Sequence, residues 1–204
     1  MSVRKRFNQG EMSDIDNTVL LMFLNRTCFN GLYRVNSKGE FNVPFGRYKN
    51  PKICDAETIY ADSELLQKVD IISGDFEQTE QYVAKDTFVY FDPPYRPLDA
   101  TSSFNSYAKE AFNDDEQIRL KKYFDRLSGK NCLMMLSNSD CRGRNPEDTF
   151  FDDLYKDYFI ERVYASRSVN AIPEKRGKLT ELLIRNYSET MASRPKLPNN
   201  VDLR

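Results

Sequence analysis

The stretch Thr87-Phe88-Val89-Tyr90-Phe91 is an apolar run that ends abruptly in the turn Asp92-Pro93-Pro94-Tyr95. A short run of aromatic and β-branched residues without alternation is typical of a strand that lies inside a parallel sheet. The two prolines then end the strand, because proline lacks the backbone N–H that a sheet ladder needs. The stretch predicts a buried strand of an α/β protein, with a rigid polar turn at its carboxyl end.

Further helices and strands are predicted on both sides of this strand. Helices are expected at 14–25, 55–68, 77–83, 114–128 and 150–155. Strands are expected at 69–73, 132–136, 159–164 and 179–186, and the last two strands could form a hairpin. The alternation of strands and helices from residue 55 onward favours a mostly parallel α/β sheet. Ligands bind such sheets at the carboxyl ends of strands. Gly74-Asp75-Phe76, the 92–95 turn and Ser137-Asn138-Ser139 all lie at such ends.

The composition excludes several classes of site. The chain contains no histidine, and its four cysteines lie far apart with no C-x-x-C pair. Zinc fingers, catalytic triads and Cys/His dyads each need imidazole or clustered thiolates, so no bound metal is expected. Isolated cysteines are typical of reduced thiols, which favours a cytoplasmic protein. The longest apolar run, Val19–Leu24, has six residues; a membrane span needs roughly 20, so no membrane association is expected.

Charge is distributed unevenly along the chain, although the net charge is −1. Residues 1–53 carry 9 basic and 4 acidic side chains, residues 54–164 carry 13 and 23, and residues 165–204 carry 8 and 4. Between residues 26 and 52, aromatic side chains interleave with arginines and lysines among many turn signals, which predicts a long basic loop region. The two basic ends could present a positive surface to a polyanion, or they could form an ordinary solvated surface.

The turn after the central strand offers hydrogen-bond acceptors. Because Pro93 and Pro94 have no N–H, the backbone carbonyls of Asp92 and Pro93 can face outward beside the Asp92 carboxylate. These acceptors suit an amino group with two hydrogens, and Tyr95 supplies a flat ring on which an aromatic base can stack. The alternative is a rigid strand-end turn whose aspartate simply faces water.

Several stretches of the chain resemble the D12-class, Dam-like adenine-N6 DNA methyltransferases. The Asp-Pro-Pro-Tyr turn is common to amino-methyltransferases in general, so by itself it indicates a reaction and no substrate. Leu24–Arg34 and Gly39–Tyr48 are similar to the DNA-recognition stretch of this family, which is a far more specific resemblance. Ser137-Asn138-Ser139 also agrees, and the resemblance extends over residues 17–187.

This resemblance implies a fold, a domain organisation and a reaction. The implied fold is an α/β, Rossmann-like methyltransferase sheet, incomplete at its N-terminus, with a mainly helical and loop-rich DNA-recognition subdomain. Residues 1–68 are expected to recognise the DNA target, residues 69–190 to form the C-terminal part of the catalytic domain, and residues 191–204 to form a tail. The implied reaction transfers a methyl group from S-adenosyl-L-methionine to N6 of an adenine flipped out of double-stranded DNA, with GATC as the expected site.

The resemblance also implies roles for individual residues. Asp92, Pro93, Pro94 and Tyr95 are expected to be catalytic, with Asp92 also touching the cofactor and Tyr95 stacking on the adenine. Asp75 and Phe76 are expected beside the adenine of the cofactor, or else they are a loop aspartate and a core phenylalanine. Ser137-Asn138-Ser139 either lines the base pocket or forms a polar turn. The residues expected to contact DNA are Asn30, Leu32, Arg34 and Pro44 at base edges, and Arg26 and Arg47 at phosphates or at the base step.

One departure from the family concerns the cofactor. Its members begin with a glycine-rich segment whose turns let the backbone approach the cofactor, whereas no G-x-G precedes Gly31 here and the chain has only 8 glycines. A strand–helix–strand unit of about 30 residues is therefore expected to be missing, and another chain could supply it. The alternative is a truncated, catalytically inactive remnant that binds DNA. A methyltransferase for another amine is a weaker third possibility.

Overall fold

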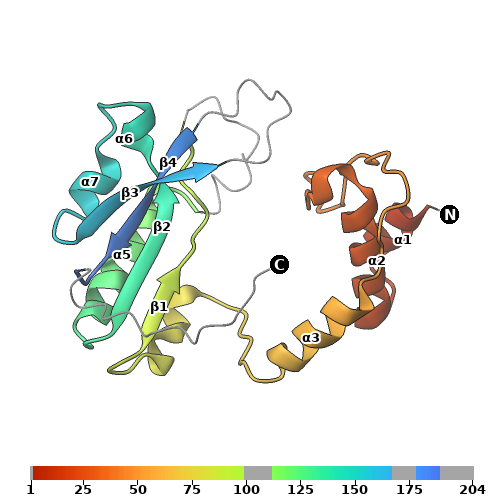
Figure 1. Cartoon of the computed structure of the whole chain (residues 1–204), viewed down its shortest axis with the longest axis horizontal. Coiled ribbons are helices and arrows are strands. Elements are labelled where there is room, and N and C mark those ends of the chain that lie inside the picture. Colours follow the sequence, from red (N-terminus) through yellow and green to blue (C-terminus); the bar gives the residue numbers. More distant parts are fainter. Residues whose placement is uncertain (1, 99–111, 167–177, 189–204) are drawn as a thin grey trace, which may run out of the picture. The chain divides into compact units, whose positions relative to one another are not determined.

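Figure 1 shows the computed structural model, which describes residues 2–98, 112–166 and 178–188. The expected tail at 191–204 lies outside the described residues. The chain folds as two compact units, Met1–Ser73 and Gly74–Arg204. Each unit has a buried apolar core of its own.

The first unit consists of short helices and a looped hairpin. Its helices are α1 (Val3–Gln9), α2 (Asp14–Thr27), the 3-10 helix η1 (Phe29–Gly31) and α3 (Ala56–Leu66). The Ser13 side chain caps α2 by accepting a hydrogen bond from the Asp16 N–H at 3.2 Å, and acidic residues in the first turn complement the helix dipole. The helices predicted at 14–25 and 55–68 are confirmed, whereas α1 is not among the predicted elements.

Side chains of α1 hold the hairpin that follows α2. The Asn8 side-chain amide donates to the Phe41 carbonyl at 3.1 Å and accepts from the Phe41 N–H at 2.8 Å. It thus satisfies both backbone groups of Phe41, as a neighbouring strand would. Arg4 donates to the Val43 carbonyl at 3.3 Å, and Phe7 packs edge-on against Phe41. The buried core beneath these contacts is formed by Leu24, Cys28, Phe41 and Val43. The basic segment predicted as a loop is therefore anchored by both helices.

The second unit is built on a sheet whose four described strands have the order β1-β2-β4-β3. They are β1 (Phe88–Phe91), β2 (Leu133–Ser139), β3 (Phe159–Ser166) and β4 (Lys178–Arg185). β1 and β2 are parallel, while β4 runs antiparallel to both β2 and β3. The sheet is mixed rather than mostly parallel, because the last two strands pair with each other. A mixed sheet with flanking helices is consistent with the predicted Rossmann-like methyltransferase fold.

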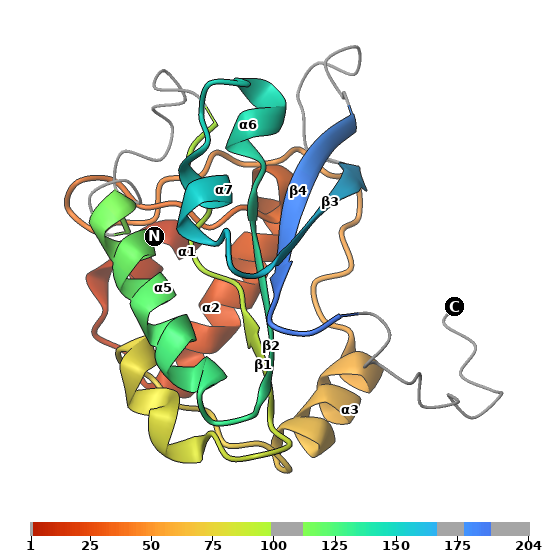
Figure 2. The ribbon, with the colours of Figure 1, turned by 90° about the vertical axis from the view of Figure 1, so that its left-hand side faces the viewer.

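Helix α5 (Asp114–Ser128) packs on one face of this sheet (Figure 2). Its Tyr123, Phe124 and Leu127 are fully buried, and they share a core with Phe91, the last residue of β1. Each large apolar side chain removed from water contributes roughly 1.5–3 kcal/mol, so α5 fixes the strand end from which the 92–95 turn begins. The other helices are η2 (Phe76–Tyr82), α6 (Cys141–Arg144) and α7 (Phe150–Leu154). No helix among the described residues is long and apolar enough to cross a membrane.

The segment at 69–73 does not form the predicted buried strand. Within the described chain these residues pair with no other strand, and Val69, Ile71 and Ile72 are 51%, 77% and 49% exposed. A strand must satisfy its backbone N–H and C=O groups against a neighbour, and apolar side chains alone do not supply one. The prediction of a strand here is wrong for this structure.

Candidate functional site

The Asp92–Tyr95 turn leaves the sheet at the carboxyl end of β1, as predicted. Asp92 is exposed, and Ser137, near the carboxyl end of the neighbouring β2, donates to its Oδ1 at 3.3 Å. Ser137 in turn accepts from the Tyr90 hydroxyl at 2.9 Å. This relay holds the Asp92 carboxylate at the surface, where it can accept hydrogen bonds from a ligand.

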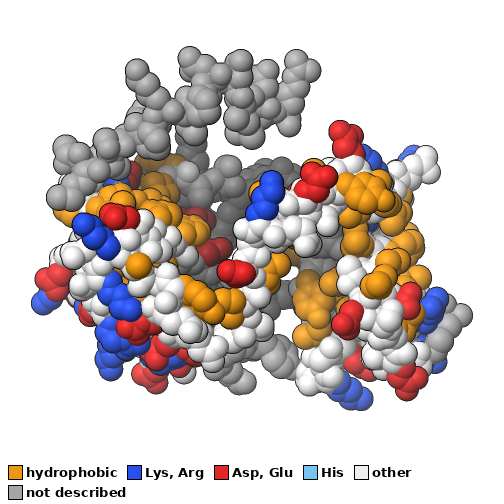
Figure 3. Space-filling view, turned by 90° about the horizontal axis from the view of Figure 1, so that it is seen from below, with side chains coloured by type: hydrophobic (Ala, Val, Ile, Leu, Met, Phe, Trp, Pro, Cys, Tyr) orange, Lys and Arg blue, Asp and Glu red, His pale blue; other side chains and the backbone are white. Residues whose placement is uncertain are grey.

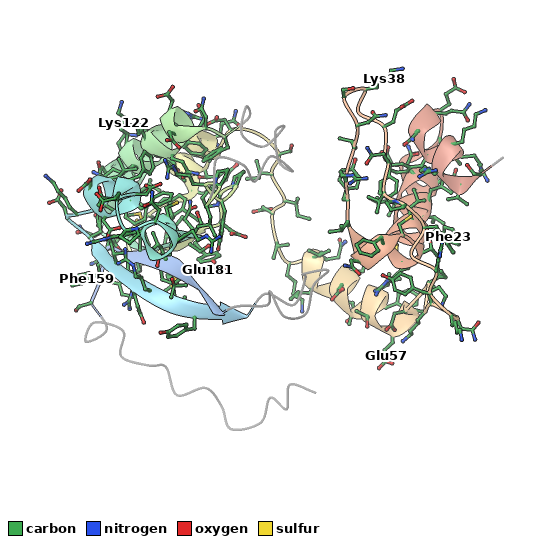
Figure 4. All side chains as sticks on the ribbon, turned by 90° about the horizontal axis from the view of Figure 1, so that it is seen from above. Phe23, Lys38, Glu57, Lys122, Phe159 and Glu181 are labelled. Carbon is green, nitrogen blue, oxygen red and sulfur yellow. The ribbon has the colours of Figure 1, made fainter. Side chains whose placement is uncertain are left out.

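Tyr95 lies half-buried at the other end of the turn, after the half-buried Pro93 and the exposed Pro94. Its hydroxyl donates across 3.4 Å to Glu181 Oε2, a residue of β4 labelled in Figure 4. Burial raises the pKa of Tyr95 above its usual value; a side-chain interaction with Ser137 opposes this rise, and nearby carboxylates add to it. The phenol therefore stays protonated near neutral pH. It offers a ligand a neutral aromatic ring with one hydroxyl.

The two residues that follow Ser137 face the protein interior. Asn138 is 0% exposed and Ser139 is 3% exposed. Asn138 Oδ1 accepts from the Arg96 N–H at 3.0 Å, and the Ser139 hydroxyl donates to the Arg96 carbonyl. Ser137 is also only 3% exposed, but its hydroxyl contacts Asp92. All three residues belong to β2 rather than to a polar turn, and Asn138 and Ser139 hold the backbone at Arg96 from the interior.

Asp75 and Phe76 lie at the start of η2, where Arg119 joins them to α5. Asp75 accepts from the Glu77 N–H at 2.9 Å and pairs with Arg119 through contacts of 2.8 and 3.1 Å. These hydrogen bonds, chiefly those from Arg119, lower the pKa of Asp75 below its usual value. The Arg119 guanidinium also lies 4.1 Å from the centroid of the Phe76 ring. Sequence reasoning missed Arg119, because an arginine on a helix carries no signal for a distant loop partner.

Tyr123 of α5 connects this pair to the turn. Its ring lies 5.5 Å from the Phe76 ring and 6.1 Å from that of Phe91, which immediately precedes Asp92. The structure thus attaches both groups of predicted site residues to one helix through a shared core neighbour. Among the described residues, no three acidic or thiol side chains gather closely enough to hold a metal ion.

The residues expected to contact DNA are all exposed and all lie in the first unit. They are Arg26, Asn30, Leu32, Arg34, Pro44 and Arg47. Asn30 and Arg47 adopt left-handed backbone conformations, with φ of 52° and 56°. The Asn30 N–H donates to the Tyr48 hydroxyl at 2.8 Å, and the Phe29 N–H donates to the Pro44 carbonyl at 2.9 Å. The two stretches that resemble the recognition region are therefore tied together.

Arg34 is held by Asn42 across the hairpin whose tip carries Lys38 (Figure 4). Arg34 Nε donates to Asn42 Oδ1 at 2.7 Å, and Nη2 donates to the Asn42 carbonyl at 3.2 Å. A guanidinium presents two edges of paired donors, and Asn42 occupies the Nε–Nη2 edge. The Nη1–Nη2 edge is the one that can meet a base. Asn42 belongs to the quoted recognition stretch, but its part in holding Arg34 needs the folded hairpin to be seen.

Arg26 lines a surface cavity of about 380 Å³ in the first unit. The other lining residues are Asn25, Gly31, Tyr48, Lys49, Pro51 and Lys52. Lys52 pairs with Asp55 at 2.6 Å, so Arg26 and Lys49 give the cavity its excess positive charge. A cavity of this charge favours an anionic group such as a phosphate.

Comparison with known proteins places the chain among DNA methyltransferases. A family model of the D12 class N6 adenine-specific DNA methyltransferases matches residues 1–169. The chain is 50% identical over 181 residues to the type II methyltransferase M.MjaIII of Methanocaldococcus jannaschii, a match that covers 88% of this chain and 61% of that protein. It is 45% identical over 179 residues to the type II methyltransferase M1.LlaDCHI of Lactococcus lactis subsp. cremoris, with coverage of 87% and 61%. It is 34% identical over 181 residues to the DNA adenine methylase of Haemophilus influenzae, with coverage of 88% and 60%.

The chain spans 60–61% of the length of these relatives. The matched residues include both the hairpin that carries the exposed basic side chains and the Asp92–Tyr95 turn. Because the family model covers most of the chain and both of these features, the chain belongs to the D12 class N6 adenine-specific DNA methyltransferases.

Proposed function

We propose that this chain provides the target-recognition unit and the methyl-acceptor site of a cytoplasmic enzyme that methylates adenine N6 in double-stranded DNA at GATC, with S-adenosyl-L-methionine as the donor. Residues 1–68 are assigned to recognition, 69–190 to the catalytic domain and 191–204 to a tail. The observation that carries the proposal is the exposed Asp92 carboxylate, held by Ser137 beside a half-buried tyrosine ring. A relative named DNA adenine methylase supports the choice of DNA as substrate.

The turn fits an exocyclic amine. The Asp92 carboxylate and the backbone carbonyls of Asp92 and Pro93 accept hydrogen bonds from the two N6 hydrogens of an adenine that has left the base stack. Accepting these bonds turns the nitrogen lone pair away from the ring and strengthens it as a nucleophile. Tyr95 stacks on the base and holds it in one plane, so that little more than alignment is required of the site.

The residues present also fit part of a site for the cofactor. When bound, the cofactor supplies a methyl group on a cationic sulfonium, whose sulfur leaves as a neutral thioether without acid catalysis. The Asp92 carboxylate offers a negative charge to the cationic part, and the half-buried Phe76 offers a ring for the purine. Asp75 is engaged by Arg119, so this ion pair holds Asp75 and Phe76 in place beside the proposed site.

A further glycine-rich segment, in the same polypeptide or in another chain, is proposed as the partner that completes the cofactor site. The supporting observation is the face of the sheet opposite α5, where Phe88, Tyr90 and Leu133 are 55%, 53% and 41% exposed. Figure 3 shows apolar side chains at the surface of this unit. Strands of a parallel pair are normally covered on both faces. The alternative function is a DNA-binding remnant that transfers no methyl group.

The test of the proposed function is the product itself. DNA carrying a single GATC is incubated with S-adenosyl-L-methionine and either this chain or this chain joined to the glycine-rich segment of a relative. N6-methyladenine is then measured by mass spectrometry of the digested DNA. We expect methylation with the completed enzyme; its absence there, with duplex binding retained, would support the remnant instead.

The isolated chain is expected to bind S-adenosyl-L-methionine weakly or not at all, because Asp92 and Phe76 form only part of a site. Isothermal titration calorimetry should show no saturable heat up to about 1 mM cofactor. The completed enzyme serves as the positive control. Micromolar binding by the isolated chain would show that no further segment is needed.

Arg34→Ala is expected to relax the DNA preference at one base pair, because a bidentate arginine–guanine contact is worth about 1–3 kcal/mol of discrimination. Fluorescence anisotropy with GATC duplexes and single-base variants, at two salt concentrations, measures this effect. Asn42→Ala should reduce the same discrimination by less, since Arg34 then keeps its donors but loses its support.

Arg47→Ala is the matched control for Arg34→Ala, because Arg47 is also an exposed arginine of the first unit. If Arg47 meets a phosphate, its loss should weaken all duplexes alike and reduce the salt dependence of binding. An equal loss of affinity for every duplex in Arg34→Ala would rule out base reading by Arg34.

A further inference from the structure

The structure assigns Gln117 and Asn138 as positioning residues that hold Tyr95 by clamping the peptide groups on either side of it. This inference rests on the proposed function, in which the Tyr95 ring stacks on the target base. Neither residue touches the proposed ligands, because Gln117 is 1% exposed and Asn138 is 0% exposed. Both act through the backbone of the turn.

The clamp consists of two hydrogen bonds from opposite sides of Tyr95. Gln117 Nε2 donates to the Pro94 carbonyl at 3.0 Å, which belongs to the peptide group before Tyr95. Asn138 Oδ1 accepts from the Arg96 N–H at 3.0 Å, which belongs to the peptide group after it. With both peptide groups held, the direction of the Tyr95 Cα–Cβ bond is determined before any base arrives.

The two amide side chains also fix each other. Asn138 Nδ2 donates to Gln117 Oε1 at 3.3 Å, and Asn138 Oδ1 accepts a second hydrogen bond from the Ser139 N–H at 2.9 Å. Each amide therefore has one orientation that satisfies its partners, since rotating either by 180° would set donor against donor or acceptor against acceptor. In a buried site such a mismatch is costly, so the network has a single arrangement.

Arg96 anchors the outgoing end of the turn. Its guanidinium contacts Asp114 at 2.8 Å and Asp148 at 2.6 Å, and it lies 4.5 Å from the centroid of the Phe150 ring. Asp114 is the first residue of α5, and Phe150 is the first residue of α7. The chain that leaves Tyr95 is thus tied to two helices as well as to β2.

A clamp of this kind lowers the cost of ordering the site when the base binds. A ring that is already held in its stacking position loses little freedom on contact with the base, so more of the interaction energy remains for binding and alignment. The three acceptors at Asp92 and Pro93 lie in the same turn and are steadied by the same bonds.

The clamp can be tested without DNA or cofactor. The sequence contains no tryptophan, so Tyr95→Trp introduces a single fluorescent reporter at the clamped position. Gln117→Met, which keeps a similar length but removes the donor and the acceptor, is then added. We expect the acrylamide quenching constant of the reporter to rise about twofold and its steady-state anisotropy to fall, because the turn gains local freedom.

Leu127→Val is the matched control, because Leu127 lies on the same helix and is fully buried in the apolar core. It should lower the Tm without changing the quenching constant of the reporter. Unchanged quenching in Gln117→Met, or an equal rise in Leu127→Val, would overturn the inference.

A second measurement uses the unmodified chain and does not depend on how any variant folds. If Asn138 holds the Arg96 N–H, hydrogen exchange at that amide should be markedly slower than at exposed loop amides, and exchange as fast as theirs would overturn the clamp. The outcome for the proposed function is separate. If the clamp is found but Tyr95→Ala leaves methylation by the completed enzyme unchanged, the stacking role is wrong and the clamp stands.

Discussion

Asp92→Ala should abolish methyl transfer by the completed enzyme, with a fall in the single-turnover rate of about 10²–10³-fold or more. In the proposed function the exposed carboxylate accepts a hydrogen bond from N6 and so directs the lone pair of that nitrogen toward the methyl group. Losses of this size are typical when one preorganised polar group is removed from a reacting centre. Transfer of a radiolabelled methyl group to a GATC duplex in a single turnover measures the effect.

Two further variants test whether the fall in the methyl-transfer rate is specific to the Asp92 carboxylate. Ser137→Ala removes the hydroxyl that contacts Asp92 at 3.3 Å, so it should slow transfer by less than Asp92→Ala does. Asp70→Ala, at an exposed position outside the site, should leave the rate unchanged. Duplex affinity should be largely retained in all three variants, because none of them removes a residue that is expected to contact DNA. Turnover close to wild type in Asp92→Ala would end the amine-methylation interpretation.

Asp140→Ala should cause a large loss of stability, about 2–4 kcal/mol in the free energy of unfolding. The Asp140 side chain is 1% exposed and joins three elements that follow β2. It accepts from Thr180 of β4 at 2.6 Å, from the Gly143 N–H of α6 at 3.0 Å, and from Arg162 of β3 at 3.1 Å. Its removal takes the acceptor from these part-buried hydrogen bonds and opens a cavity where the carboxylate lay.

Urea denaturation at neutral pH measures this change. The expected loss of about 2–4 kcal/mol is not larger because Arg162 is one-third exposed and keeps its second partner, Asp152, at 2.8 Å. Asp157→Ala, at an exposed position, is the control and should change the free energy of unfolding by no more than about 0.5 kcal/mol. If Asp140→Ala lowers the free energy of unfolding by less than about 1 kcal/mol, water replaces the carboxylate and the hydrogen bonds of Asp140 do not stabilise the packing of these elements.

Elements with a strong local signal were predictable from the sequence. Helix α2 begins where the predicted helix 14–25 begins, α5 carries its apolar side chains at helical spacing, and β1 ends just before the Asp-Pro-Pro turn. The apolar segment 69–73 shows the limit of this reasoning. Its composition suits a strand, but pairing depends on a neighbouring strand, and within the described chain it has none.

In the candidate site, too, some features could be predicted from the sequence and others could not. The Asp92–Tyr95 turn and the basic loop region were visible in the sequence because both consist of residues that lie together along the chain, whereas the hairpin shape of that region was not predicted. Whether Asn138 faces a ligand or the interior was left open, and burial decided it. Arg119 was missed, because its contacts with Asp75 and Phe76 become apparent only when α5 packs beside η2.

The sequence by itself determined the chemistry that this chain can offer: a rigid acceptor turn with an aromatic ring, and a basic loop region that resembles a DNA-recognition stretch. It did so because proline geometry, strand composition and turn residues act over a few neighbouring positions. Only the tertiary structure decided which side chains hold that chemistry in place. Gln117 meets Pro94 across 23 residues of sequence, and Asn138 meets Arg96 across 42. Contacts over such separations arise from the packing of α5 and β2 against the turn, and no local pattern of residues encodes them.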